Sequence, residues 1–142
     1  MKNLFISLLL ALGAITLLNG CSSGLESLGL QVHLVKLEKK SDDLYLASLS
    51  FSNPNVGALN IVKSTHTLLL NGQPAGVMEI TDPLGLPAQQ AITSTVMFRR
   101  AAGAADISGT ATYQLSSLVT LNIYAENNER YKTNSSGTVA VQ

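Results

Sequence analysis

Few residues of this chain have the types and spacing that catalysis or metal binding requires. The sequence contains two histidines, His33 and His66, and a single cysteine, Cys21. No H-x-x-x-H, C-x-x-C or paired-carboxylate spacing accompanies them, and no G-x-S-x-G elbow is present. The sequence therefore predicts no catalytic residue, no metal site and no cofactor, and it favours a protein that is not an enzyme.

The two histidines have ordinary structural interpretations. His33 shares a strand face with Gln31, so we expect it on the surface. His66 has the same parity as Leu68 and Leu70, so we expect it to be half-buried. The acidic pair Asp42-Asp43 is typical of a solvated turn rather than of a cation site.

Cys21 follows a segment with the composition of a signal peptide. Lys2 supplies a positive charge, and residues 4–18 are almost entirely apolar. That run is short for a membrane span, which needs about 20 residues. Leu18-Asn19-Gly20-Cys21 resembles the bacterial lipobox, which implies cleavage before Cys21 and diacylation of its thiol. The alternatives are an uncleaved membrane anchor or a buried cysteine.

The lipobox resemblance also implies a domain organisation and a location. Residues 1–20 would be the signal peptide, residues 21–27 the lipidated tether, and residues 28–142 one folded domain. Acyl chains on Cys21 would bind a membrane, each buried CH₂ contributing about 0.8 kcal/mol. In lipoprotein sorting, an aspartate directly after the cysteine resembles an inner-membrane retention signal, but residue 22 is a serine. We therefore expect the outer membrane, with the domain facing the periplasm.

Composition narrows the class of partner. The formal net charge of the full chain is 0, so loss of Lys2 would leave the mature protein near −1. No basic cluster indicates nucleic-acid binding. A lone cysteine excludes an intrachain disulfide, and the absence of tryptophan predicts a mostly aliphatic core.

Hydrophobic alternation predicts an all-β chain. We expect bulges near Val35 and near Lys63-Ser64, where the alternation changes parity. Pro74 favours an edge position for its strand. The predicted strands are residues 28–38, 44–52, 59–70, 73–81, 91–98, 109–115 and 118–125, and two short β-runs, residues 130–133 and 138–141, close the chain.

The sequence also predicts the conformation of two segments that connect strands. Residues 82–87 read as a loop, in which Leu84-Gly85-Leu86 either packs over one end of the fold or forms an exposed tip for a partner. Residues 99–106 read as the one short helical turn. Seven or eight short strands with regular turns indicate an antiparallel β-sandwich.

The segment between two turns carries a family resemblance. Asn53-Pro54-Asn55 is followed by a long strand that ends in leucines, and Asn71-Gly72 predicts a type I′ hairpin. This arrangement, together with the ending Ser136–Val141, resembles the WHy domain of type 2 late embryogenesis abundant (LEA) proteins. The resemblance covers roughly residues 28–141. It implies a fibronectin-III-like or immunoglobulin-like sandwich of about seven strands with at most one short helix.

The resemblance also implies a function. Together with the lipobox, it favours a non-catalytic, membrane-anchored protein that protects others during desiccation, osmotic stress or cold. One physical way to do so is to shield apolar surface on partly unfolded client proteins. The alternative is a structural or accessory lipoprotein that binds a protein partner in an envelope complex. We expect Asn53, Pro54, Asn55, Asn71 and Gly72 to shape the backbone rather than to bind a ligand.

Overall fold

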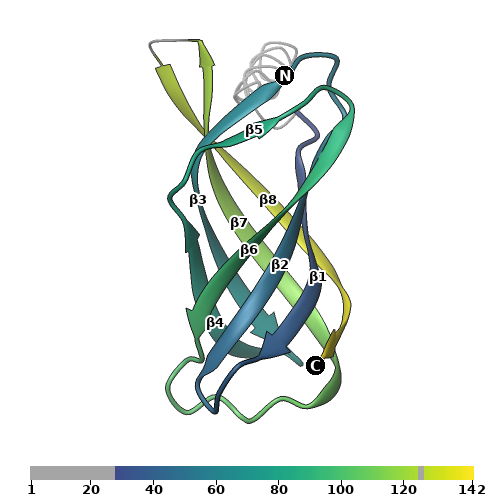
Figure 1. The fold of residues 1–142 in the computed structure, drawn as a ribbon, viewed down its shortest axis with the longest axis vertical. Helices are drawn as coiled ribbons and strands as arrows, with labels where there is room; N and C mark the ends of the chain where they lie inside the picture. Colours follow the sequence, from purple (N-terminus) through teal and green to yellow (C-terminus); the bar gives the residue numbers. More distant parts are fainter. Residues whose placement is uncertain (1–27, 125–126) are drawn as a thin grey trace, which may run out of the picture.

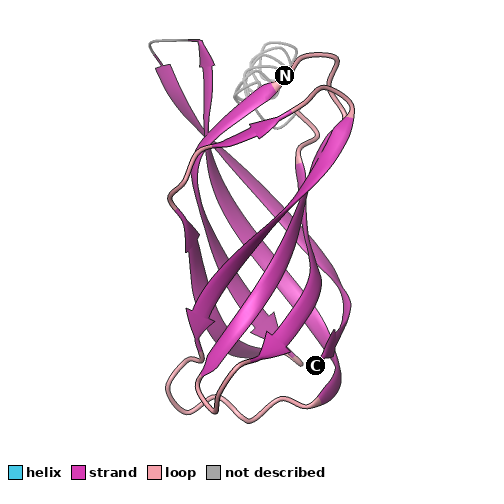
Figure 2. Ribbon diagram, viewed as in Figure 1, coloured by secondary structure: helices cyan, strands magenta, loops and turns pink. Residues whose placement is uncertain are grey.

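The computed structural model describes residues 28–124 and 127–142, which form strands and loops without any helix (Figures 1 and 2). Within that part of the chain, no segment is a helix long and apolar enough to span a membrane. The strands are β1 (Gln31–Lys39), β2 (Leu44–Asn53), β3 (Leu59–Leu70), β4 (Gln73–Ile80), β5 (Leu84–Leu86), β6 (Gln90–Arg99), β7 (Gly109–Tyr124) and β8 (Asn127–Val141).

The all-β prediction is confirmed, but the strands form one continuous sheet rather than two facing sheets. Their hydrogen-bonded order is β4-β3-β7-β8-β1-β2-β6, and β5 pairs with β3 outside this path. The sheet curls into a half-barrel around a single core (Figure 1). The long strands make this possible, because a strongly twisted sheet curls on itself as it widens.

The expectation of a wholly antiparallel sheet is wrong at one junction. β1 and β8 run parallel and pair at Leu37 and Val141. Two backbone hydrogen bonds extend this contact, from Lys39 N–H to Gln142 O at 2.8 Å and from Gln142 N–H to Leu37 O at 3.0 Å. The first and last strands therefore meet in the middle of the sheet.

β7 is one strand where the sequence predicted two. The predicted break lies at Ser116-Ser117, where two polar residues interrupt the apolar pattern. Ser117 instead points into the core, where its hydroxyl lies 2.8 Å from the ring of His66. A buried polar pair that satisfies itself does not end a strand.

β8 likewise joins two predicted strands. Its polar middle pairs continuously with β7, and Ser135 also donates a hydrogen bond to Val32 O of β1 at 2.5 Å. Gly137 lies against the ring of Tyr113, where an added Cβ would come within 3.0 Å of a ring carbon. β8 also begins at Asn127, three residues before the predicted start at residue 130.

The predicted helical turn at residues 99–106 is absent. The segment is a loop in which Ala101 N–H binds Ala75 O of β4 at 2.8 Å. Gly103 has a φ of 77°, which a right-handed helix does not allow. Tertiary hydrogen bonding to β4 thus overrides the helix propensity of the alanines.

The predicted loop at residues 82–87 contains β5. Leu84–Leu86 pairs antiparallel with the start of β3, from Leu59 to Ile61. Leu86 is buried and Leu84 is partly buried against the core. Of the two alternatives, packing over the end of the fold is the one observed.

Several local predictions are confirmed. Register shifts occur between Leu34 and Lys36 in β1 and between Ile61 and Lys63 in β3. These bulges let apolar residues on both sides of each shift face the core. The buried hydrophobic residues are mostly aliphatic, with Tyr45 and Phe51 among the largest.

The two end strands of the sheet, β4 and β6, contact each other around Gly76 and Phe98. Pro74 lies in β4, which is an edge strand as predicted. At Gly76 of β4, an added Cβ would lie 2.5 Å from the Phe98 ring and 2.9 Å from Arg99 O of β6. Glycine therefore allows β4 and β6 to touch here, although no strand ladder joins them.

Candidate functional site

Asn53, at the end of β2, organises the first family-like turn from inside the protein. Its side chain is 1% exposed. Its amide nitrogen donates to Gly57 O at 2.9 Å and to Pro87 O at 3.0 Å, and it lies 3.4 Å from Leu86 O. Its oxygen accepts from Asn55 N–H at 3.0 Å. One buried amide thus ties together the β2–β3 turn and the end of β5.

Asn55 and Pro54 connect this turn to the start of the domain. The Asn55 side chain donates to Leu28 O at 2.6 Å and to the Asn53 side-chain oxygen at 2.9 Å. Gly29 has a φ of 62°, and an added Cβ would meet the Pro54 ring at 2.9 Å. The chain therefore enters the domain directly over the Asn53-Pro54-Asn55 turn.

Asn71-Gly72 forms the second family-like turn at the other end of β3. Asn71 has a φ of 49° and Gly72 a φ of 78°, as a type I′ turn requires. Asn71 also binds β7, since its N–H donates to Thr112 O at 2.8 Å and its side-chain oxygen accepts from Thr112 N–H at 2.9 Å. The predicted hairpin is confirmed.

The two turns do not come together into one site. β3 separates them by 12 residues, which at about 3.3 Å per residue is roughly 40 Å. The hydrogen bonds of Asn53, Asn55 and Asn71 go chiefly to backbone groups of this chain. These residues therefore hold turns and neighbouring strands in place through hydrogen bonds within the fold.

His66 is more deeply buried than the sequence predicted, at 0% exposure. Its Nδ1 lies 2.8 Å from the Ser117 hydroxyl and its Nε2 lies 2.9 Å from the Ser64 hydroxyl. The ring meets Phe51 edge-on, with centroids 5.7 Å apart. Burial lowers the pKa of His66 to about 4. Solvent does not reach His66 or its two serine partners, so these side chains cannot contact a substrate. Their hydrogen bonds support the fold.

His33 and the acidic pair take the ordinary positions predicted for them. His33 is partly exposed, and its Nε2 lies 3.3 Å from the Gln31 side-chain oxygen. Asp42 and Asp43 belong to a turn where each forms an ion pair, with Lys39 and Arg99 respectively. Among residues 28–124 and 127–142, no three His, Cys, Asp or Glu side chains cluster as metal ligands would. Cys21 lies outside the described residues.

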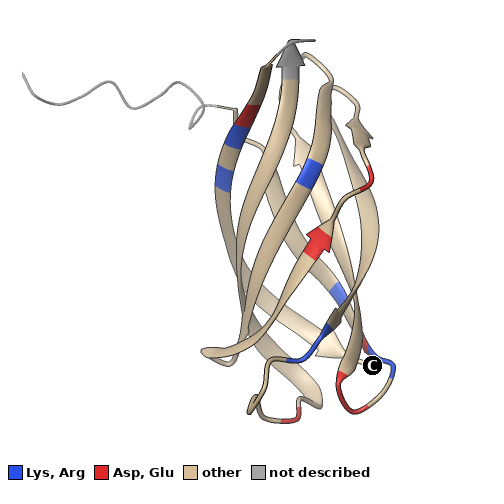
Figure 3. Cartoon of the chain, turned by 90° about the vertical axis from the view of Figure 1, so that its left-hand side faces the viewer, with Lys and Arg blue, Asp and Glu red and all other residues tan. Residues whose placement is uncertain are grey.

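Charged residues gather around the β1–β2 and β6–β7 connections, at the end of the half-barrel where the C-terminus lies (Figure 3). Lys39 and Asp106 form an ion pair at 2.8 Å, and Arg100 lies 3.6 Å from the same carboxylate. The hydrogen bond from Lys39 lowers the pKa of Asp106. Hydrogen bonds from Lys36 and Lys40 likewise lower the pKa of Glu38 to about 2. These exposed pairs contribute little to stability because water and salt screen them.

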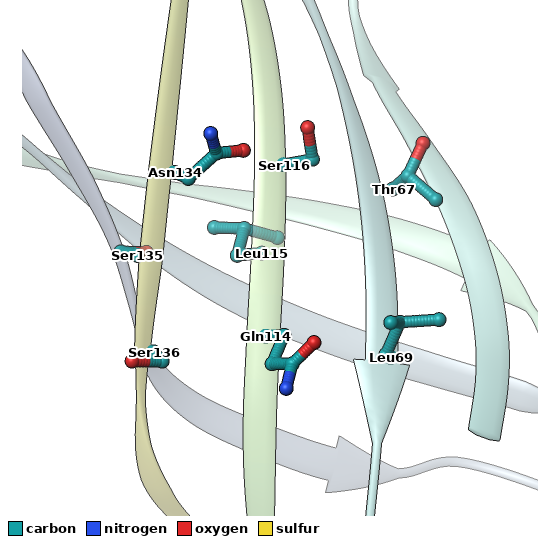
Figure 4. Close-up of a pocket in the computed structure, with 8 residues that line it drawn as sticks. All are labelled: Thr67, Leu69, Gln114, Leu115, Ser116, Asn134, Ser135 and Ser136. Atoms are coloured by element: carbon teal, nitrogen blue, oxygen red, sulfur yellow. The ribbon is translucent and has the colours of Figure 1, made fainter. Parts of the chain in front are cut away.

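A shallow hollow of about 430 Å³ on the outside of the sheet was not predicted (Figure 4). Its outward side chains come from β3, β7 and β8 and are all uncharged. Register pairs Thr67 with Ser116 and Ser116 with Asn134 in one row, and Leu69 with Gln114 and Gln114 with Ser136 in the next. The alternation of Ser, Thr, Asn and Gln in the sequence was the available signal. It is equally typical of any solvated sheet face.

Comparison with known proteins supports the fold. No family model matches the chain, and no curated protein matches it. The solution structure of AT1g01470 from Arabidopsis thaliana is similar, with a TM-score of 0.61 and 20% identity, over 80% of this chain and 82% of that one. Two others score lower. A proposed late embryogenesis abundant (LEA) protein, At2g46140.1, has a TM-score of 0.46 and 17% identity, over 96% of this chain and 83% of that one. A protein from Archaeoglobus fulgidus has a TM-score of 0.49 and 13% identity, over 80% of this chain and 98% of that one.

Proposed function

We propose that this protein is a non-catalytic lipoprotein of the WHy, or type 2 LEA, kind, which protects other proteins during desiccation, osmotic shock or cold. One observation carries the proposal. The family-like residues Asn53 to Asn55 and Asn71-Gly72 are joints of a fold that is similar to the AT1g01470 structure. Because their polar groups already bind the backbone, the motif favours a scaffold over a ligand site.

The surface of the sheet is consistent with a role that involves no chemistry. The outward rows that line the hollow over β3, β7 and β8 present neutral groups, mostly hydroxyls and amides, and a cluster of charged side chains lies at the end of the half-barrel near the C-terminus. Neutral groups of this kind keep a surface hydrated without a strong field that would select highly charged partners.

Membrane anchoring through Cys21 is part of the same proposal. The chain enters the domain at Leu28, beside the Asn53-Pro54-Asn55 turn. A tether of residues 21–27 reaches at most about 25 Å when fully extended. An acylated Cys21 would therefore hold this end of the half-barrel near the membrane, on our proposal the periplasmic face of the outer membrane. The end that carries the Lys39–Asp106 ion pair would then point away from it.

The protective role is tested by drying or freeze–thawing a labile enzyme with residues 22–142. Equal mass of an unrelated all-β domain serves as the control. We expect recovered enzyme activity to rise with the amount of domain added, without nucleotide, metal or cofactor. Recovery no better than the control would remove the protective function. The accessory-lipoprotein alternative would then lead, and a pull-down from envelope extracts would follow.

A further inference from the structure

β6 has one side without a partner strand. It pairs along its whole length with β2, from Asn53–Gln90 to Leu44–Arg99. Within the described residues, no strand is hydrogen-bonded to its other side, which faces β4 (Figure 1). Such an edge presents backbone N–H and C=O groups that can pair with another chain.

The two free edges of the sheet differ in how they are protected. β4 carries Pro74, the charged Glu79 and a register shift opposite Leu68/Leu69, all of which discourage pairing. β6 is free of proline, glycine and charge from Gln90 to Phe98. An edge of this length without protective residues is exceptional in a soluble domain, so its exposure calls for a role.

The inner face of β6 is incompletely covered. In β2, Ala47, Leu49 and Phe51 are all 0% exposed. Their direct neighbours in β6 are Val96, Ser94 and Ile92, and all three are partly exposed. Burial therefore falls off on the side where the next strand is missing. An added strand with apolar side chains on this face would complete the core.

β6 contacts β4 near its C-terminal end. β4 and β6 touch at Gly76 and Phe98 and diverge from there, while β5 crosses the far end (Figure 1). At the converging end, Val77 of β4 and Met97 of β6 are 55% and 54% exposed on the outer face. Apolar side chains thus lie on both faces of the sheet beside the free edge.

We propose that the free edge of β6, between Gln90 and Val96, binds an extended and uncharged segment of a partly unfolded protein. The segment would add to the sheet as a strand and place alternate apolar side chains against Ile92 and Val96. Main-chain hydrogen bonds would supply affinity with little sequence preference. This inference names the client-binding surface of the proposed protective function and rests on it.

A second copy of this chain fits the same edge less well. Each copy would bring its own β4, in contact with Phe98, into the space beside the other copy's β6. An unfolded segment carries no such obstruction.

The test uses a fluorescent nine-residue peptide of alternating valine and threonine, added to the full chain in non-ionic detergent. Thr95→Lys places a charge on the free edge, and Thr67→Lys is the matched control on β3, which is paired on both sides. We expect Thr95→Lys to weaken peptide binding about tenfold, or about 1.4 kcal/mol, and Thr67→Lys to leave it within about twofold. Ser94→Val, which enlarges the apolar face, should strengthen binding.

Hydrogen exchange locates the bound peptide independently. Amides of Gln90–Val96 should gain protection when the peptide is present. Equal binding by Thr95→Lys and Thr67→Lys, or protection elsewhere, would overturn the proposal. So would a dimer that Thr95→Lys disrupts in a chain that binds no peptide, because the edge would then serve a second copy. Thermal melts of each variant confirm that it is folded.

The freeze–thaw assay separates this inference from the function on which it rests. If wild type and Thr95→Lys protect the enzyme equally, the edge is not the client-binding surface, although the protective function stands. If neither protects but the peptide binds at β6, the protective function fails and the edge remains a peptide-binding surface with another partner.

Discussion

At the scale of single residues, the charge state of His66 bears directly on the stability of the fold. It is fully buried, and it hydrogen-bonds to Ser64 and Ser117 from within the core. A proton added to this ring must be accommodated among apolar neighbours such as Phe51. Burial therefore disfavours the charged form.

This burial predicts a loss of stability in mild acid. The pKa of His66 is about 4 in the folded chain and about 6.5 when it is unfolded. Above pH 6.5 the ring is neutral in both states and its contribution is complete. As pH falls from 6.5 towards 4, only the unfolded chain takes up the proton. The free energy of unfolding then drops by up to about 1.4 kcal/mol per pH unit.

Urea unfolding at pH 7.5 and pH 5 measures the effect before most carboxylates titrate. His66→Gln should reduce the difference between the two pH values, and His33→Gln should retain it. If the His66→Gln protein keeps the full difference, the pH dependence arises from other groups.

At the scale of elements, the hairpin β3–β4 depends on its two-residue turn. Gly72 has a φ of 78° and open space around its Cβ position, so a side chain there meets strain in the backbone alone. Gly72→Val should lower the free energy of unfolding by roughly 1–3 kcal/mol. Gly57→Val is the matched control, because Gly57 is also in open space but has no positive φ. Equal melting temperatures for the two variants would count against strain at the turn.

The elements themselves were largely predictable from the sequence, because strand alternation and turn residues act locally. Both bulges, the Asn71-Gly72 hairpin and the edge position of Pro74 follow from short patterns. The continuity of β7 through Ser117 could not be predicted, since it depends on His66, 51 residues away. β5 and the loop after β6 are decided by partners elsewhere in the fold, namely β3 and Ala75.

The candidate sites, too, were only partly predictable from the sequence. Asn53 and Asn71 were expected to shape turns, yet their cross-links to Pro87 and Thr112 connect segments far apart in sequence. The β6 edge was invisible in the sequence, because a strand's neighbours are set by the order of the whole sheet. Only that order reveals that the uncharged run from Gln90 to Phe98 lies at its end.

At the scale of the whole molecule, the proposed lipid anchor determines where and how the domain is displayed. Metabolic labelling with a fatty acid should tag the wild-type protein and fail to tag Cys21→Ser. Ser22→Ala, a change beside the cysteine, should keep the label. Density-gradient fractionation should then place the labelled protein with the outer membrane. Label that persists in Cys21→Ser would rule out acylation at this residue.

The parallel contact between β1 and β8 has a consequence for how the chain folds. Because the first strand lies beside the last, the centre of the sheet can be completed only after residues up to Val141 are available. Closing so long a loop is entropically costly, and sheets rich in distant contacts fold slowly, over milliseconds to seconds. A nascent chain that lacks β8 would hold β4-β3-β7 and β1-β2-β6 as two unjoined halves. Shortening the chain from its C-terminal side would therefore split the sheet through its middle rather than trim an edge.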